Sequence, residues 1–241
     1  MKNVKKAIAL VAVILGVSTM SFAQNGFSIH AGGNFPMGTF GKGGSLSDIA
    51  LNNAVAEVGG AATGFNAGLK YQFKLVSHLN AFVSADFFYN GLKSELTEGI
   101  EIEGVETSAP SYMNIPAMVG LNYSVLKVLG STIWAEVGAG INFRNITGSN
   151  VNAAWENLVW GREAEYKLST SLGWQAGAGI SLGDKISISL HYYSLGTASV
   201  DGESSFSSEL EDIFNGETKP IEFSNGKLSP SMVVVRLGYH F

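Results

Sequence analysis

The sequence has no cysteine and little charge, and each shortage excludes a class of protein. Without cysteine the chain has no disulfide framework, no cysteine-based metal site, no thiol nucleophile and no lipidated N-terminal cysteine. Charged residues make up 15% of the 241 residues, whereas an ordinary soluble domain has about 25%. Proline is also scarce, with 5 residues. The composition therefore argues against an ordinary soluble domain.

Long apolar runs are missing as well, although the chain is apolar overall. Hydrophobic residues make up 46% of the sequence, and the mean hydropathy is +0.18. After the N-terminal segment no apolar run approaches the roughly 20 residues of a transmembrane helix. Apolar residues spread without long runs indicate alternation, and the 14 Phe, 8 Tyr and 4 Trp suit β-strands. The 30 glycines follow no fixed period, which excludes a collagen-like chain.

The first 23 residues have the pattern of a secretory signal peptide. Three lysines precede an apolar stretch over residues 7–17, and Ser21-Phe22-Ala23 offers small residues at a cleavage site. An uncleaved N-terminal anchor is the alternative, but the stretch is short for a spanning helix. We therefore expect a signal peptide over 1–23 and a mature domain over 24–241. Cleavage would remove basic residues and no acidic ones from a chain of net charge −5, which argues against a nucleic-acid partner.

Eight segments of the mature chain alternate apolar and other residues with a period of two. At the C-terminus, Val233, Val235, Leu237, Tyr239 and Phe241 share one face. Each segment has roughly 9–15 residues, enough to cross a bilayer as a tilted strand. The segments are 27–35, 62–73, 79–90, 112–125, 133–144, 168–182, 185–197 and 233–241.

The connections between these segments alternate strictly between short and long. The short ones are 74–78, a turn of about six residues after Val125, and Gly183-Asp184; the long ones are 36–61, 93–111, 145–167 and 198–230. A soluble sandwich would also alternate along its strands, but it has no reason for this regular difference in loop length. The pattern predicts an all-β, transmembrane, antiparallel up-and-down barrel in the outer membrane, with eight strands. Four long loops would be external, three short turns periplasmic, and both termini periplasmic.

Three short motifs resemble a known family of small outer-membrane barrels. Tyr112-Met113-Asn114-Ile115-Pro116 resembles the Y-x-x-I-P element of the porin family of OmpX-like and OmpA-membrane-domain-like barrels. Residues 191–196 and 237–241 are similar to its aromatic-Ser-x-Gly element and its Gly-aromatic-x-Phe terminus. The resemblance implies periplasmic chaperones and insertion by the barrel-assembly machinery, which would read the C-terminal set from Val233 to Phe241. It implies no common ligand.

The polar face of the predicted strands would point into a narrow lumen that side chains fill. Isolated charges there are costly, so we expect them to pair. Counting depth along the strands pairs Glu136 with Arg236 or Lys70 on the periplasmic side, and Asp86 with Arg144 nearer the outside. Inward glycines would leave room for these side chains. The network would serve either as a static plug, the interpretation we favour, or as a gate that opens by exchange of partners. Pro116 also falls on the inward face and predicts a bulge.

Other chemistry finds little support in the sequence. His191 and Ser194 are three residues apart and so lie on opposite faces of a strand, which argues against a lipid hydrolase built on them. We expect no enzyme, no metal site and no cofactor. Trp155 and Trp160 in the third long loop are candidates for recognition, or they pack over the barrel mouth. We therefore expect a monomer among lipid and lipopolysaccharide, acting as a structural, adhesive or surface-interaction protein. A narrow gated channel is the alternative, and a lipid-modifying enzyme a remote one.

Overall fold

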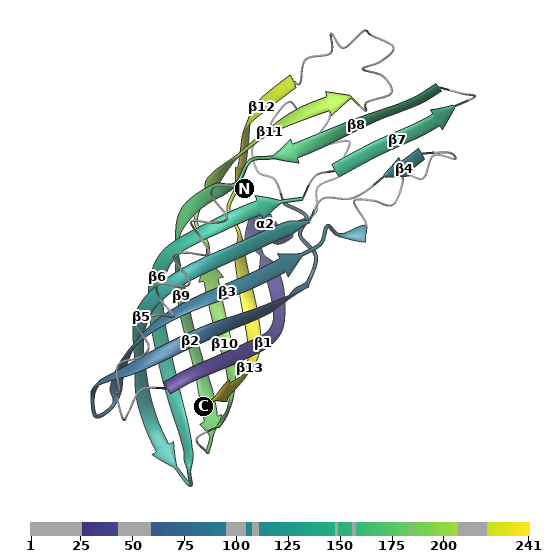
Figure 1. Ribbon diagram of the computed structural model, residues 1–241. Helices are drawn as coiled ribbons and strands as arrows, with labels where there is room; N and C mark the ends of the chain where they lie inside the picture. Colours follow the sequence, from purple (N-terminus) through teal and green to yellow (C-terminus); the bar gives the residue numbers. More distant parts are fainter. Residues whose placement is uncertain are drawn as a thin grey trace.

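A computed structural model describes residues 26–42, 59–94, 105–107, 111–147, 149–155, 158–183, 185–206 and 221–241. Eight of its strands close into an antiparallel barrel in the order β1-β13-β10-β9-β6-β5-β3-β2 (Figure 1). The predicted fold class is confirmed. The predicted signal peptide over 1–23 lies outside the described residues and stays a prediction. The barrel strands are β1 (Gly26–Met37), β2 (Gly64–Val76), β3 (Leu79–Asn90), β5 (Tyr112–Val128), β6 (Ser131–Ile146), β9 (Ser169–Leu182), β10 (Ile186–Ser194) and β13 (Ser231–His240).

Alternation along each strand separates the two faces of the wall. On β13 the side chains of Met232 and Val234 are fully buried in the lumen, whereas Leu237 and Tyr239 are exposed on the outside. The first strand pairs with the last, from Ser28 opposite His240 to Met37 opposite Ser231, so the barrel has no free edge. Within the described ranges, no helix is long and apolar enough to cross a membrane.

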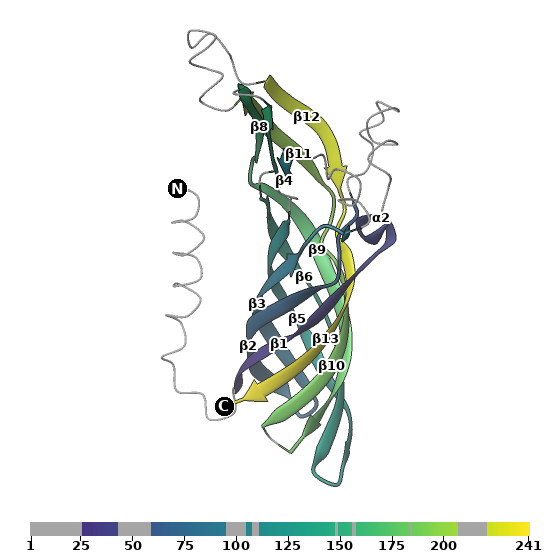
Figure 2. The same cartoon turned by 90° about the vertical axis from the view of Figure 1, so that its right-hand side faces the viewer.

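On one side the barrel wall continues beyond its rim as a second sheet of five strands (Figures 1 and 2). The strand order of this sheet is β12-β11-β8-β7-β4. It matches the order of the barrel strands β13, β10, β9, β6 and β5, because each strand of the sheet is the continuation of one of these barrel strands after a short break in the chain. The long connections predicted over 93–111, 145–167 and 198–230 therefore contain paired strands, which the sequence analysis did not predict. Trp155 and Trp160 belong to paired strands and not to a loop. The strands are β4 (Val105–Thr107), β7 (Ser149–Trp155), β8 (Leu158–Tyr166), β11 (Ala198–Phe206) and β12 (Ile221–Leu228).

The opposite end of the barrel carries three tight connections, as predicted. Leu129 and Gly130 turn the chain between β5 and β6 with φ of 50° and 79°. Gly183, with φ of 62°, begins the turn between β9 and β10. A positive φ costs glycine little, which explains its place in two of these turns.

The bulge predicted at Pro116 is absent. Pro116 pairs with Asn142 inside an unbroken register with β6, and the register with β3 is the same on both sides of it. Proline has no N–H to donate, so two pairs are missing from the ladder between β5 and β3, and the register is the same before and after this gap. The irregularity of this strand lies instead between Ser124 and Leu126.

Glycines opposite large side chains let the lumen fill. Phe82 lies level with Gly120, which in turn pairs with Gly138, and a Cβ at either glycine would overlap the Phe82 ring. Gly68 has the same relation to its neighbours, because a Cβ there would overlap Asp86 Oδ1 and His30 Nε2. A barrel of this size holds side chains and no free channel, and the glycines make that filling sterically feasible.

We therefore expect Gly68→Ala to destabilise the barrel by about 1–3 kcal/mol, the cost of overpacking a filled interior. Urea unfolding of the protein in lipid vesicles, followed by tryptophan fluorescence, measures the change. Gly26→Ala is the matched control on β1, because nothing lies within 4 Å of a Cβ there. Equal stability of the two variants would contradict tight filling around Gly68.

Candidate functional site

The lumen holds two buried ion pairs at mid-barrel. The Lys70 ammonium, from β2, contacts the Glu136 carboxylate of β6. Arg236 Nη2, from β13, lies 2.9 Å from Asp86 Oδ1 on β3. Of the two partners expected for Glu136, the structure places Lys70 beside it and holds Arg236 on Asp86.

Asp86 is the most heavily bonded carboxylate of this cluster. Besides Arg236, its Oδ1 lies 2.5 Å from His30 Nε2, and its Oδ2 accepts a hydrogen bond of 3.2 Å from the Tyr193 hydroxyl. The Arg236 guanidinium also lies 5.0 Å from the Tyr193 ring and 5.8 Å from the Phe88 ring. Several donors and two aromatic faces therefore compensate the burial of this pair.

Glu136 divides its two oxygens between different partners. Oε2 accepts from the Lys70 ammonium and, at 3.0 Å, from Asn122 Nδ2. Oε1 faces His191, whose Nδ1 lies 3.6 Å away. The Lys70 ammonium also lies 4.6 Å from the Phe82 ring and 5.1 Å from the Trp134 ring.

The expected pair of Asp86 with Arg144 is wrong. Arg144 donates to the carbonyl oxygens of Leu228 at 2.8 Å and Gly196 at 3.2 Å, and to Asn114 Oδ1 at 3.3 Å. It is only 1% exposed. In the strand register, Arg144 lies opposite Asn114, and Asn114 lies opposite Phe88. Arg144 is therefore level with Phe88, two residues beyond Asp86 toward the external sheet. The oxygens of Asp86 are also already bonded to other donors. Arg144 thus holds together the chain just after β10 and the end of β12, where the barrel continues into the external sheet.

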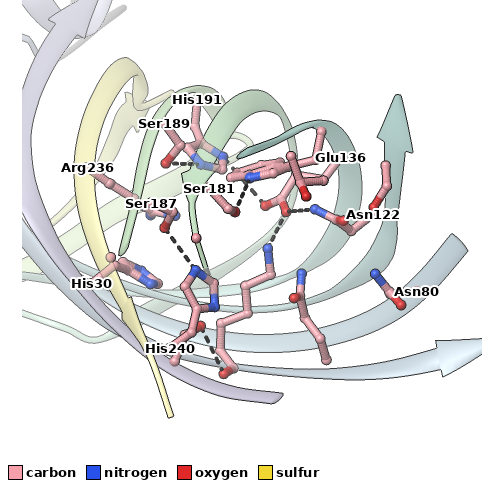
Figure 3. A pocket seen from close by; sticks show the side chains of 18 residues that line it. His30, Asn80, Asn122, Glu136, Ser181, Ser187, Ser189, His191, Arg236 and His240 are labelled. Carbon is pink, nitrogen blue, oxygen red and sulfur yellow. Dashed lines mark hydrogen bonds and ion pairs between the residues drawn. The ribbon is translucent and has the colours of Figure 1, made fainter. Parts of the chain in front are cut away.

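A polar cavity of about 220 Å³ lies between these ion pairs and the short turns (Figure 3). The sequence alone does not reveal this cavity, because its walls come from all eight barrel strands. Phe82, Phe88, Met118 and Tyr193, each at most 1% exposed, fill the lumen around the charged cluster and do not line this cavity. Side chains that matter for its chemistry are those of Lys70, Trp134, Glu136, Ser187, Ser189, His191, Arg236 and His240.

The cavity offers no evident metal site. Among the described residues, no three histidine, aspartate or glutamate side chains are grouped so that they would hold a metal ion. Its polar groups are instead paired with one another: His240 Nε2 lies 3.0 Å from Ser187 Oγ, and His191 Nε2 lies 3.0 Å from Ser189 Oγ. The alternation of β10 puts Ser187 and Ser189 on the same inward face as His191, although neither serine was singled out from the sequence.

Comparisons with known proteins reach the fold alone. No protein-family model and no curated protein matches the chain. Among solved structures, it is similar to a major outer membrane protein of Thermus thermophilus, at 13% identity over 90% of this chain and 99% of that one, with a TM-score of 0.48. It is also similar to OprG of Pseudomonas aeruginosa, at 11% identity over 90% and 96% of the two chains, with a TM-score of 0.46. A third is Ail, the attachment invasion locus protein of Yersinia pestis, at 13% identity over 90% and 97%, with a TM-score of 0.40. One barrel fold hosts many functions, so these likenesses assign no activity.

Removal of the charge on Asp86 is expected to weaken the barrel strongly. Asp86→Asn leaves the Arg236 guanidinium buried without its carboxylate, and breaking such a pair costs about 3–5 kcal/mol. Glu203→Gln is the matched control, because Glu203 and Lys167 form an exposed pair at 2.9 Å, and exposed pairs contribute about 0–1 kcal/mol. Urea unfolding in vesicles compares the two. A loss no larger for Asp86→Asn than for Glu203→Gln would show that the buried pair is dispensable.

Proposed function

We propose that the chain is an outer-membrane protein with a closed lumen, which acts at the cell surface through its external sheet and loops. The observation that carries the proposal is the edgeless barrel with an apolar outer wall. Large exposed apolar side chains cover seven of its eight strands, among them Ile29, Leu69, Val119, Val137, Leu172, Leu190 and Leu237. A soluble monomer rarely exposes so large an apolar surface, and a closed barrel is the only sheet that satisfies its backbone in lipid.

The ends of the barrel give its orientation. Short turns are typical of the periplasmic side of such barrels and long connections of the outer side. The five-stranded sheet would then stand outside the cell. Its outermost strand β12 pairs with β11 alone among the described residues, and an unpaired strand edge is a template for pairing with another chain. This edge supports a surface-interaction or adhesive role.

The same orientation supports the remaining partners. Lipid and lipopolysaccharide would surround the apolar wall, and periplasmic chaperones with the barrel-assembly machinery would deliver the chain. The proposed assembly signal, Val233, Val235, Leu237, Tyr239 and Phe241, lies on the outer face or at the end of β13, where a machine could read it before closure with β1. Because the closed wall leaves no strand edge within the membrane, we expect a monomer.

A narrow gated channel is the second candidate, because the cavity leads from the short-turn end to the Lys70–Glu136 pair. We expect the lumen to stay closed when that pair is neutralised, since Phe82, Phe88, Met118 and Tyr193 still fill it. The test is single-channel conductance of the refolded chain in a planar bilayer, wild type against the double variant Lys70→Gln with Glu136→Gln. Heat-dependent gel mobility confirms that each barrel is folded. Steady conductance steps in either protein would overturn the closed lumen and favour the channel.

The external sheet is tested by replacing residues 199–227 with a short turn. This design keeps Gly196 and Leu228, whose carbonyls bind Arg144, so the barrel should keep its heat-dependent mobility. We expect cells that display this variant to lose adherence to neighbouring cells and to wells coated with collagen, fibronectin or mucin. The control shortens residues 43–57, which lie outside the described external sheet. Undiminished adherence of the first variant, or none by the wild type, would argue against the adhesive role.

A further inference from the structure

We propose that the lumen cavity is a hydrolytic site for short-chain acyl esters, with Ser189 as nucleophile, His191 as general base and Glu136 as the carboxylate that orients His191. The observation is a linear set of contacts across two strands. Ser189 Oγ lies 3.0 Å from His191 Nε2, and His191 Nδ1 lies 3.6 Å from Glu136 Oε1. A nucleophile, a base and an orienting group in this sequence define a serine hydrolase on any fold. The site is independent of the proposed surface role and requires only the folded barrel.

The strand register explains how the three groups meet. Ser189 and His191 are two residues apart on β10, so their side chains share the inward face. Gly177 lies between His191 and Glu136, paired with His191 on one side and with Glu136 on the other. A Cβ on Gly177 would overlap the His191 ring. The glycine therefore allows the imidazole to lie over β9 and to face the carboxylate on β6.

The hydrogen bonds of Glu136 leave one oxygen for the histidine. Lys70 and Asn122 both donate to Oε2, whereas Oε1 faces His191 Nδ1. His191 Nδ1 is buried and has no hydrogen-bond partner, so Glu136 Oε1 is the acceptor it faces. A proton on Nδ1 would point toward the carboxylate and would leave the Nε2 lone pair for the Ser189 hydroxyl. Catalytic contacts in empty sites are often long and shorten with substrate, so 3.6 Å is compatible with this role.

The cavity determines the class of substrate. A volume of about 220 Å³ lies below the roughly 300–1,000 Å³ of pockets for drug-sized ligands, which favours a short acyl group. Ser189 pairs with Arg236 in the β10–β13 register, and both line the cavity. The guanidinium would place positive charge near the oxyanion that forms on attack. Substrate would enter from the short-turn end.

The reaction balances with water as the second substrate. Ser189 Oγ bonds to the carbonyl carbon of the ester while its proton passes to His191 Nε2. The tetrahedral intermediate collapses, the bond to the alcohol oxygen breaks, and His191 returns the proton to that oxygen. Water then attacks the acyl-serine with His191 again as base. The bond between the acyl carbon and Ser189 Oγ breaks, and His191 returns the proton to Oγ. The products are the alcohol and a carboxylic acid, and Ser189 is free again.

A second serine on the same face supplies a matched control. Ser187 lies two residues before Ser189, lines the same cavity and is bonded to His240 at 3.0 Å. In the described part of the chain no carboxylate orients His240. Ser187 therefore has a base without its third partner, and we expect it to be unreactive.

The experiment treats the refolded full chain in detergent micelles with a small fluorophosphonate and locates the adduct by peptide mass mapping. We expect an adduct on Ser189 in the wild type and in Ser187→Ala. We also expect hydrolysis of para-nitrophenyl acetate to fall by about 10²-fold or more in His191→Gln, the usual contribution of a general base. Ser189→Ala should lose both adduct and hydrolysis while keeping the heat-dependent mobility of a folded barrel.

Substitution by cysteine gives a second readout that does not depend on ester turnover. Because the chain has no cysteine, Ser189→Cys and Ser187→Cys each carry a single thiol. We expect iodoacetamide to alkylate Cys at position 189 at least ~10-fold faster at neutral pH, since the orienting carboxylate helps His191 to form the thiolate. An adduct on Ser187, an adduct on neither serine, or equal alkylation of the two thiols would overturn the proposal.

Discussion

The structure depends on one constraint, which is that an eight-stranded barrel is only wide enough for side chains to fill most of its lumen. Four charged side chains at mid-barrel must therefore satisfy one another, and they do so as Lys70 with Glu136 and Arg236 with Asp86. Tyr193, His30 and Asn122 supply the remaining hydrogen bonds. Glycines on the neighbouring strands supply the space. Closure of the wall, filling of the lumen and pairing of the charges are thus three aspects of a single packing problem.

The same wall carries two different surfaces along its length. In the barrel the outer face is apolar, as lipid requires, and closure leaves no edge. Beyond the rim the strands continue as an open sheet, whose edges are compatible only with water or with a partner. Arg144 lies at the boundary and binds the carbonyls of Gly196 and Leu228, where the two surfaces join. Its position suggests why a buried guanidinium is kept without a carboxylate.

Much of the barrel was predictable because alternation with period two is local. Residues on one parity of β13 or β6 had to face the lumen, and the glycines opposite them followed from the same count. The ion pairs depend on how far neighbouring strands are shifted along one another. Counting residues from the ends of each strand does not give this shift. For that reason the sequence did not predict that Asp86 pairs with Arg236 and not with Arg144. The external sheet was missed because its strands follow short breaks, so that 145–167 and 198–230 resembled loops. Ser189 becomes a candidate only through its distance to His191 Nε2, because a serine two residues from a histidine is common on strands and no sequence motif marks it.

The ion pairs also favour the proposed plug over a gate. For Glu136 to leave Lys70 for Arg236, Arg236 would have to abandon Asp86, which would lose its one permanently charged donor while still buried. Breaking a buried pair in this way costs about 3–5 kcal/mol. The exchange would also withdraw Glu136 Oε1 from His191. A fixed cluster therefore serves both closure of the lumen and an ordered cavity beneath it, whereas a mobile one would serve neither.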